Sequence, residues 1–200
     1  MKKHTAISIG NRCASVQYRT DHFNLTKALG YKTCPFDLMF STLSGVIDCL
    51  NTDFKFFCDP KLLQVNHLGM EDNHERFLIE HKLYKNWQFN HESVEPGKYG
   101  PELSQHWDEG PYTFVHNNFE KFIERYERRI ANFKYYCESG YYVDFILFFY
   151  HEQYSKGTIN ELNCSIQKRF PFLDYKIIVV KVCNNTSPPT IVEDYIINKN

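Results

Sequence analysis

Residues 141–183 decide the fold, because two apolar runs flank a helical segment there: YYVDFILFFY at 141–150, TINELNCSIQKRF at 158–170 and YKIIVVKVC at 175–183. Continuous apolar runs are typical of strands that are covered on both faces. A helix between two such strands predicts a parallel βαβ unit, whose crossover is right-handed in nearly all proteins. We therefore expect one α/β domain over residues 1–200, with a mixed or mostly parallel sheet flanked by helices.

The remaining elements follow from hydrophobic periodicity. A strand is expected at Thr5–Ile9, and amphipathic helices are expected from Ala14 to Leu29, from Leu38 to Leu50 and from Asn117 to Tyr136. Residues 86–111 hold three of the nine Gly and three of the eight Pro, together with Trp87, Tyr99 and Trp107, so we expect an ordered loop that covers a cleft. Shorter extended pieces are expected at Phe54–Phe57, at Leu62–Val65, at Tyr112–His116 and after residue 184.

Charge and cysteine content exclude several classes of function. The formal net charge is −1, which gives no general reason to expect nucleic acid or an acidic membrane as a partner. No apolar run approaches the roughly 18 residues of a membrane helix, and no signal peptide is apparent. The seven cysteines are odd in number and lack a CxxC pair, which favours reduced thiols in the cytoplasm.

A histidine-rich stretch is the other candidate for chemistry. His67, His74, His81 and His91 lie among acidic residues but form no HExxH pattern, so we interpret the stretch as a solvated face. No metal and no cofactor are expected.

Cys13 is the candidate nucleophile. Gly10 and Asn11 predict a turn after the first strand, and the thiol then precedes a helix. Backbone N–H groups and the helix dipole at such a position favour the thiolate, and Arg12 adds a positive charge. The alternative is a buried structural cysteine, which is the usual state of a free thiol.

Four pieces of the chain carry a resemblance to a known family. They are SIGNRC at 8–13, CPFDLMFS at 34–41, VHN at 115–117 and RYERRI at 125–130. In this order the pieces resemble the papain-like cysteine peptidase family that was first catalogued as a domain of unknown function and occurs in bacteria and large DNA viruses. The resemblance covers about residues 5–182. It implies Cys13 as nucleophile, His116 as base, and an α+β papain-like fold as the alternative architecture.

The remaining site residues complete this hypothesis. Asp37 is the first candidate for orienting the imidazole, Asp144 is the second, and Asn117 is also possible. The N-cap of a helix beginning at Leu38 is the alternative role of Asp37. Asn11 and the backbone N–H of Cys13 are candidates for an oxyanion hole. Arg128 and Arg129 cannot share one helix face, so we expect one to be exposed and the other to reach a carboxylate such as Asp37, or an anionic group of the substrate.

Two departures from papain leave other functions open. No glutamine precedes Cys13, and the second half of the chain predicts a parallel sheet. The leading hypothesis is a cytoplasmic cysteine hydrolase, located in host cytoplasm if the protein is viral, that acts on a peptide or other acyl bond, including one in a protein. One alternative is a non-catalytic module that binds a glycan, a nucleotide or a protein. The other is an SGNH-like acyl hydrolase or acyltransferase, in which Ser8 offers the only serine match.

Overall fold

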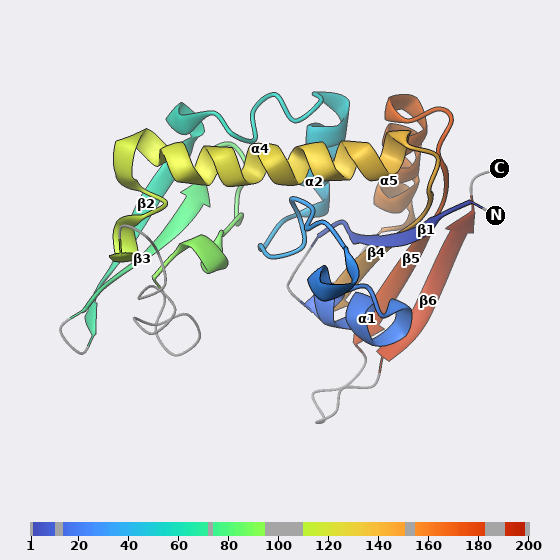
Figure 1. Ribbon diagram of the computed structural model, residues 1–200, viewed down its shortest axis with the longest axis horizontal. Coiled ribbons are helices and arrows are strands. Elements are labelled where there is room, and N and C mark those ends of the chain that lie inside the picture. The colour runs from blue at the N-terminus through green and yellow to red at the C-terminus, as the bar shows by residue number, and fades with distance from the viewer. Residues whose placement is uncertain are drawn as a thin grey trace.

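The computed structural model describes residues 2–10, 14–71, 74–94, 110–150, 155–182 and 191–198. Its main sheet has the strand order β1 (His4–Ser8), β4 (Tyr142–Tyr150), β5 (Asp174–Val182), β6 (Ile191–Asn198). β1, β4 and β5 are parallel, and β6 is antiparallel to β5 (Figure 1). Helix α5 (Lys156–Arg169) connects β4 to β5. The predicted α/β domain with a mostly parallel sheet is confirmed.

The sheet lies between two helical layers, because alternate residues of its strands point to opposite faces. Ala6, Ile146 and Ile178 pack on one face in a cluster with Tyr18 of α1 (Ala14–Phe23). On the other face, residues such as Phe145 belong to the main core, together with side chains of α2 (Leu43–Asn51), α4 (His116–Glu138) and α5. Figure 1 shows these three helices on one side of the strands and α1 on the other.

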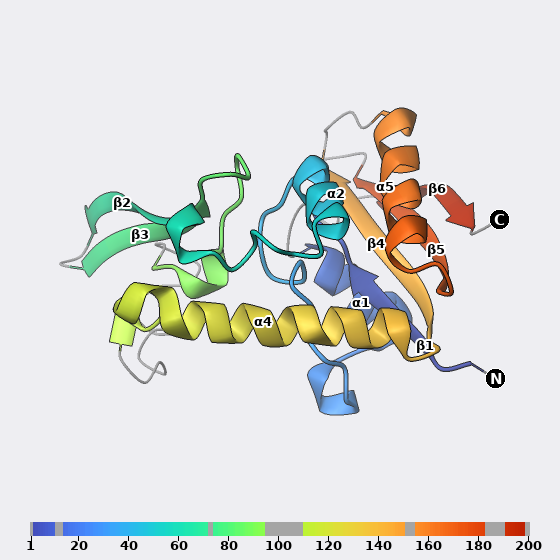
Figure 2. The same ribbon diagram turned by 90° about the horizontal axis from the view of Figure 1, so that it is seen from above.

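A hairpin of β2 (Leu63–Glu71) and β3 (His74–His81) forms a separate antiparallel sheet. Helix α4 runs past this hairpin and on to the main sheet (Figure 2). Its Phe122 ring lies 4.7 Å from Phe89, which follows the hairpin, and its Phe133 ring lies 6.0 Å from Phe145 of β4. One helix therefore packs against both parts of the core.

Four predicted elements were wrong in type or extent. The helix expected at Leu38 begins at Leu43 after the N-cap Thr42, so Asp37 is not an N-cap. The first helix ends at Phe23, and a separate 3-10 turn, η1, covers Lys27–Leu29. The piece Phe54–Phe57 is a turn that buries the rings of Phe54 and Phe57, and Tyr112–His116 contains the end of the 3-10 turn η4 (Gly110–Tyr112) and the start of α4. In both pieces, aromatic residues that pack into the core from turns gave a sequence pattern resembling that of a strand.

The expected covering loop is described only in part. Trp87 and Phe89 are fully buried in the main core, and η3 (Asn90–Glu92) follows them. The prediction that Trp87 belongs to a cover was therefore wrong. Residues 95–109, with Tyr99 and Trp107, lie outside the described residues. The 3-10 turn η2 (Pro60–Leu62) leads into the hairpin.

Candidate functional site

The end of β1 carries the first part of the candidate site. Asn11, Arg12 and Cys13 lie outside the described residues, and α1 begins at the next residue, Ala14. Gly10 adopts φ +133°, and a Cβ there would lie 2.8 Å from Oγ of Ser41, so this position requires glycine. The Ser8 hydroxyl is fully buried and is bonded to the hydroxyl of Ser15 and to the carbonyl of Phe36.

Asp37 is the centre of a buried cluster beside this strand end. Its carboxylate accepts hydrogen bonds from Nη1 of Arg19 at 2.9 Å, from the hydroxyl of Tyr31 at 3.0 Å and from the backbone N–H of Cys34 at 2.8 Å. The Arg19 guanidinium stacks 3.8 Å from the centre of the Tyr31 ring. Asp37 is 1% exposed and Arg19 5%. The Cys-Pro-Phe-Asp turn is therefore joined to α1 by a buried ion pair, which the sequence did not predict.

Four other thiols are unsuited to act as nucleophiles. Burial raises the pKa of Cys34, Cys49 and Cys137 well above that of a free thiol, and raises the pKa of Cys58 to about 12. These groups stay protonated at neutral pH, and only the thiolate reacts readily. Cys164 is exposed on α5.

His116 begins α4 on the side of the hairpin. Its exposed ring stacks against Tyr112, with 5.8 Å between ring centres, and Tyr112 in turn stacks on Phe77 of β3. The next three residues, Asn117, Asn118 and Phe119, all have φ between +51° and +66°, a run that L-residues rarely adopt. His116 is thus held on an irregular turn.

Each of the predicted orienting residues has a partner other than His116 in the structure. Asp37 is bound to Arg19, Tyr31 and Cys34, as described above. Asp144 is paired with Ala6 in the sheet register. Its Oδ2 lies 3.0 Å from Nε2 of His4 and 3.5 Å from Nζ of Lys176. The Asn117 amide donates to Glu120 at 3.2 Å. The Cys13–His116 pair itself stays a prediction, because Cys13 lies outside the described residues.

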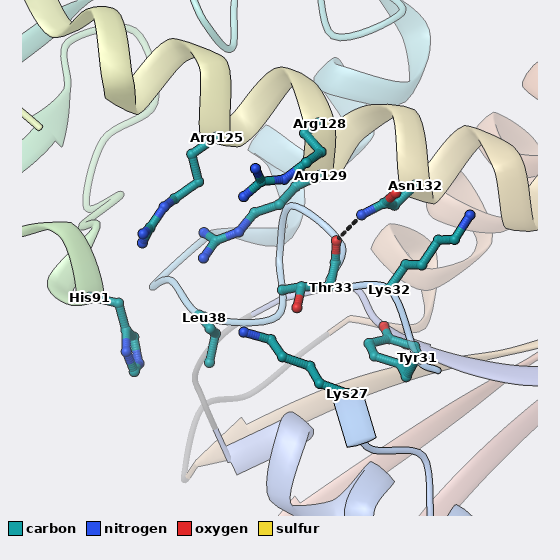
Figure 3. Close-up of a pocket in the computed structure, with 10 residues that line it drawn as sticks. All are labelled: Lys27, Tyr31, Lys32, Thr33, Leu38, His91, Arg125, Arg128, Arg129 and Asn132. Carbon is teal, nitrogen blue, oxygen red and sulfur yellow. Dashed lines mark hydrogen bonds between the residues drawn. The ribbon is translucent and has the colours of Figure 1, made fainter. Parts of the chain in front are cut away.

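A pocket of about 690 Å³ lies between α4 and the segment that follows α1 (Figure 3). Figure 3 shows that Arg125, Arg128 and Arg129 extend into it from α4, and that Lys27 approaches from the opposite wall. Arg128 is exposed, whereas Arg129 is 6% exposed. The described residues that line the pocket are Lys27, Tyr31, Lys32, Thr33, Leu38, His91, Arg125, Arg128, Arg129 and Asn132.

Glu92 holds two of these arginines in place. Its fully buried Oε1 lies 3.0 Å from Nη1 of Arg125 and 3.1 Å from Nη1 of Arg129, while Oε2 accepts a hydrogen bond from Tyr126. The prediction that one arginine of the Arg128–Arg129 pair is exposed and the other reaches a carboxylate is confirmed. The carboxylate is Glu92 and not Asp37, because Asp37 is paired with Arg19.

His91 is the pocket histidine that the sequence-based hypothesis did not use. Burial lowers the pKa of its imidazole, and the nearby Arg129 and Arg125 lower it further against the opposing effect of Glu92. The neutral imidazole is the form that accepts a proton. The RYERRI run was the only sequence signal for this pocket, since Lys27 and Lys32 lie about a hundred residues away from it.

The described residues show no feature of a metal site or of a membrane span. No group of three His, Cys, Asp or Glu side chains among them could hold a metal ion. In the same part of the chain, no helix is long and apolar enough to cross a bilayer. The hairpin histidine His67 bonds Glu75 at 2.7 Å.

Comparison with known proteins adds one match. No curated protein and no solved structure matches the chain. A family model described as "Putative papain-like cysteine peptidase" matches residues 4–185, which includes Cys13, Asp37 and His116. Because this match spans most of the 200 residues, the chain belongs to that papain-like cysteine peptidase family.

Proposed function

We propose that the protein is a cysteine hydrolase that cleaves a peptide or other acyl bond, with Cys13 as nucleophile and His116 as base. The observation that carries this proposal is the family match over residues 4–185, which contains both residues in the order Cys then His. The α/β architecture supports it, because ligands of such folds bind beyond the carboxyl ends of the parallel strands. Cys13 follows β1 in the sequence by five residues.

The proposed reaction uses ordinary thiol chemistry. His116 takes the proton of the Cys13 thiol, and the thiolate attacks the acyl carbon. The Asn11 amide and the Cys13 backbone N–H stabilise the resulting oxyanion. The imidazolium then protonates the leaving group, and water hydrolyses the thioester. Asp37, Asp144 and Asn117 are the candidates for orienting the imidazole, and Arg128 is a candidate for contacting the substrate.

The alternative SGNH-like reaction is not supported by the surroundings of Ser8. Its hydroxyl is fully buried and is bonded to Ser15 and Phe36, so it has no access to an acyl substrate. The binding-module alternative is favoured by one observation, the cationic pocket, and it would leave Cys13 without a reactive role.

Alkylation by iodoacetamide at pH 6 separates these functions. Peptide mapping by mass spectrometry reports each cysteine separately, and Cys164 serves as the exposed reference thiol on a helix. We expect Cys13 to react roughly tenfold faster than Cys164, because a lowered pKa raises the thiolate fraction at this pH. Equal rates at Cys13 and Cys164 would refute the nucleophile.

The role of His116 as base is tested by measuring the alkylation rate of Cys13 in three variants. His116→Gln should slow the alkylation of Cys13, whereas His67→Gln, which changes an exposed histidine of the hairpin, should not. His91→Gln tests the pocket histidine as the competing base. If His91→Gln slows the reaction and His116→Gln does not, the Cys13–His116 pair is wrong. Cys13→Ala should also abolish covalent labelling by a peptidyl electrophile.

A further inference from the structure

The pocket beside α4 collects positive charge in a protein that has almost no net charge. Five cationic side chains line it, and none of the described lining residues is acidic. The formal net charge of the whole chain is −1, so this concentration is not a consequence of a basic composition. Clefts lined by charge of one sign concentrate ligands of the opposite sign.

Several of these cations are not neutralised within the protein. Lys27 and Arg128 are exposed, and no carboxylate of the described residues lies within ion-pair distance of either. The Lys32 ammonium lies 4.1 Å from the centre of the Tyr135 ring, which leaves its N–H groups available. Glu92 is shared by Arg125 and Arg129, so one negative charge faces two guanidinium groups.

Arg129 provides a second and independent observation. Its side chain is more than nine-tenths buried, and Figure 3 shows it pointing into the pocket. Nη1 lies near Glu92, but in a geometry that makes no hydrogen bond, so it is a buried donor without an acceptor. Leaving such a donor unsatisfied in the protein interior is unfavourable. An anionic oxygen in the pocket would satisfy it.

We propose that this pocket binds a phosphate group carried by a small molecule. Guanidinium groups on one wall and an ammonium group on the other can surround the three terminal oxygens of a phosphomonoester, whereas a single carboxylate offers only two. The Asn132 amide also lines the pocket, although it already donates to the Thr33 carbonyl at 2.9 Å. The volume of about 690 Å³ exceeds that of a phosphate ion, and Tyr31 and Leu38 provide an apolar surface for the rest of the ligand.

Isothermal titration of the full chain tests this site. The probes are glycerol 2-phosphate, inorganic phosphate and citrate, at two salt concentrations. We expect glycerol 2-phosphate to bind with a Kd below 1 mM, at least as tightly as inorganic phosphate, and about tenfold more tightly than citrate. Affinity should fall as salt rises, because the interaction is between exposed charges.

A charge-matched pair of variants locates the binding. Lys27→Gln with Arg128→Gln removes two pocket charges and should weaken binding of glycerol 2-phosphate at least tenfold. Lys85→Gln with Lys168→Gln removes two exposed charges that do not line the pocket and should change it less than twofold.

Four results would overturn the proposal. They are the absence of binding at 1 mM glycerol 2-phosphate, citrate binding as tight as phosphate binding, an equal loss in both double variants, and binding of inorganic phosphate with exclusion of the ester. Neither the probes nor the variants involve Cys13, so this test and the alkylation test can fail separately.

Discussion

Replacing Asp37 by Asn should destabilise the fold strongly, although the two side chains have nearly the same shape. Asp37 accepts from Arg19, Tyr31 and Cys34 in a site that is 1% exposed. Either orientation of an Asn amide places its NH₂ group against one of these donors. The substitution also leaves the buried guanidinium of Arg19 without a counter-charge, and breaking a buried pair in this way costs about 3–5 kcal/mol. For a chain of this length we expect the melting temperature to fall by about 10 °C.

Urea denaturation followed by far-UV circular dichroism measures this cost. Asp59→Asn is the matched control, because Asp59 caps η2 by accepting from the Lys61 N–H, and Asn caps about as well as Asp. Arg19→Met and the double variant complete a thermodynamic cycle, in which we expect a coupling of about 2–3 kcal/mol between Asp37 and Arg19. The ion pair does not stabilise the turn if the free energy of unfolding of Asp37→Asn lies within about 1 kcal/mol of the wild-type value. The same conclusion follows if the effects of Asp37→Asn and Arg19→Met are additive in the double variant.

Three further outcomes follow from packing and charge. Gly45→Ala should lower the free energy of unfolding by about 1–3 kcal/mol, because the new Cβ would lie 2.7 Å from the buried Trp87 ring. Gly157→Ala meets no such contact and should be nearly neutral. Urea denaturation of both variants measures the difference. Burial lowers the pKa of His81, so the unfolded chain takes up the proton at a higher pH than the folded protein does. The free energy of unfolding should therefore fall as the pH drops below about 6.5. Urea titrations at several pH values should show a weaker dependence on pH in His81→Gln than in the wild type. Glu92→Gln should cost about 3–5 kcal/mol in the same assay, because it removes the counter-charge of the buried Arg129 guanidinium, and an unchanged midpoint would contradict this.

The sequence was a good guide where one periodicity covered a whole element. The apolar runs of β4 and β5 and the stripe of α4 each predicted the observed element to within about two residues. It was a poor guide where aromatic residues pack from turns. Phe54 adopts φ +63° and is buried, and a local pattern cannot distinguish such a ring from one on a strand.

The candidate site divides in the same way. Adjacent residues on a helix face different directions, so the sequence could predict that Arg128 and Arg129 separate. It could not identify the partner of Arg129, because Glu92 lies 37 residues earlier and is placed there by the packing of η3 against α4. The partner of Asp37 was missed for the same reason, since Arg19 reaches it from α1.

The continuity of α4 limits how this protein can change. Its regular part, residues 120–138, extends for about 28 Å and packs Phe122 against Phe89 beside the hairpin and Phe133 against Phe145 of the main sheet. One residue inserted between these two rings would turn the second half by about 100° relative to the first, so that only one of the two could keep its contacts. The number of residues between Phe122 and Phe133 is therefore fixed more strictly than their identity. Length variation in relatives that keep both contacts belongs in the loops.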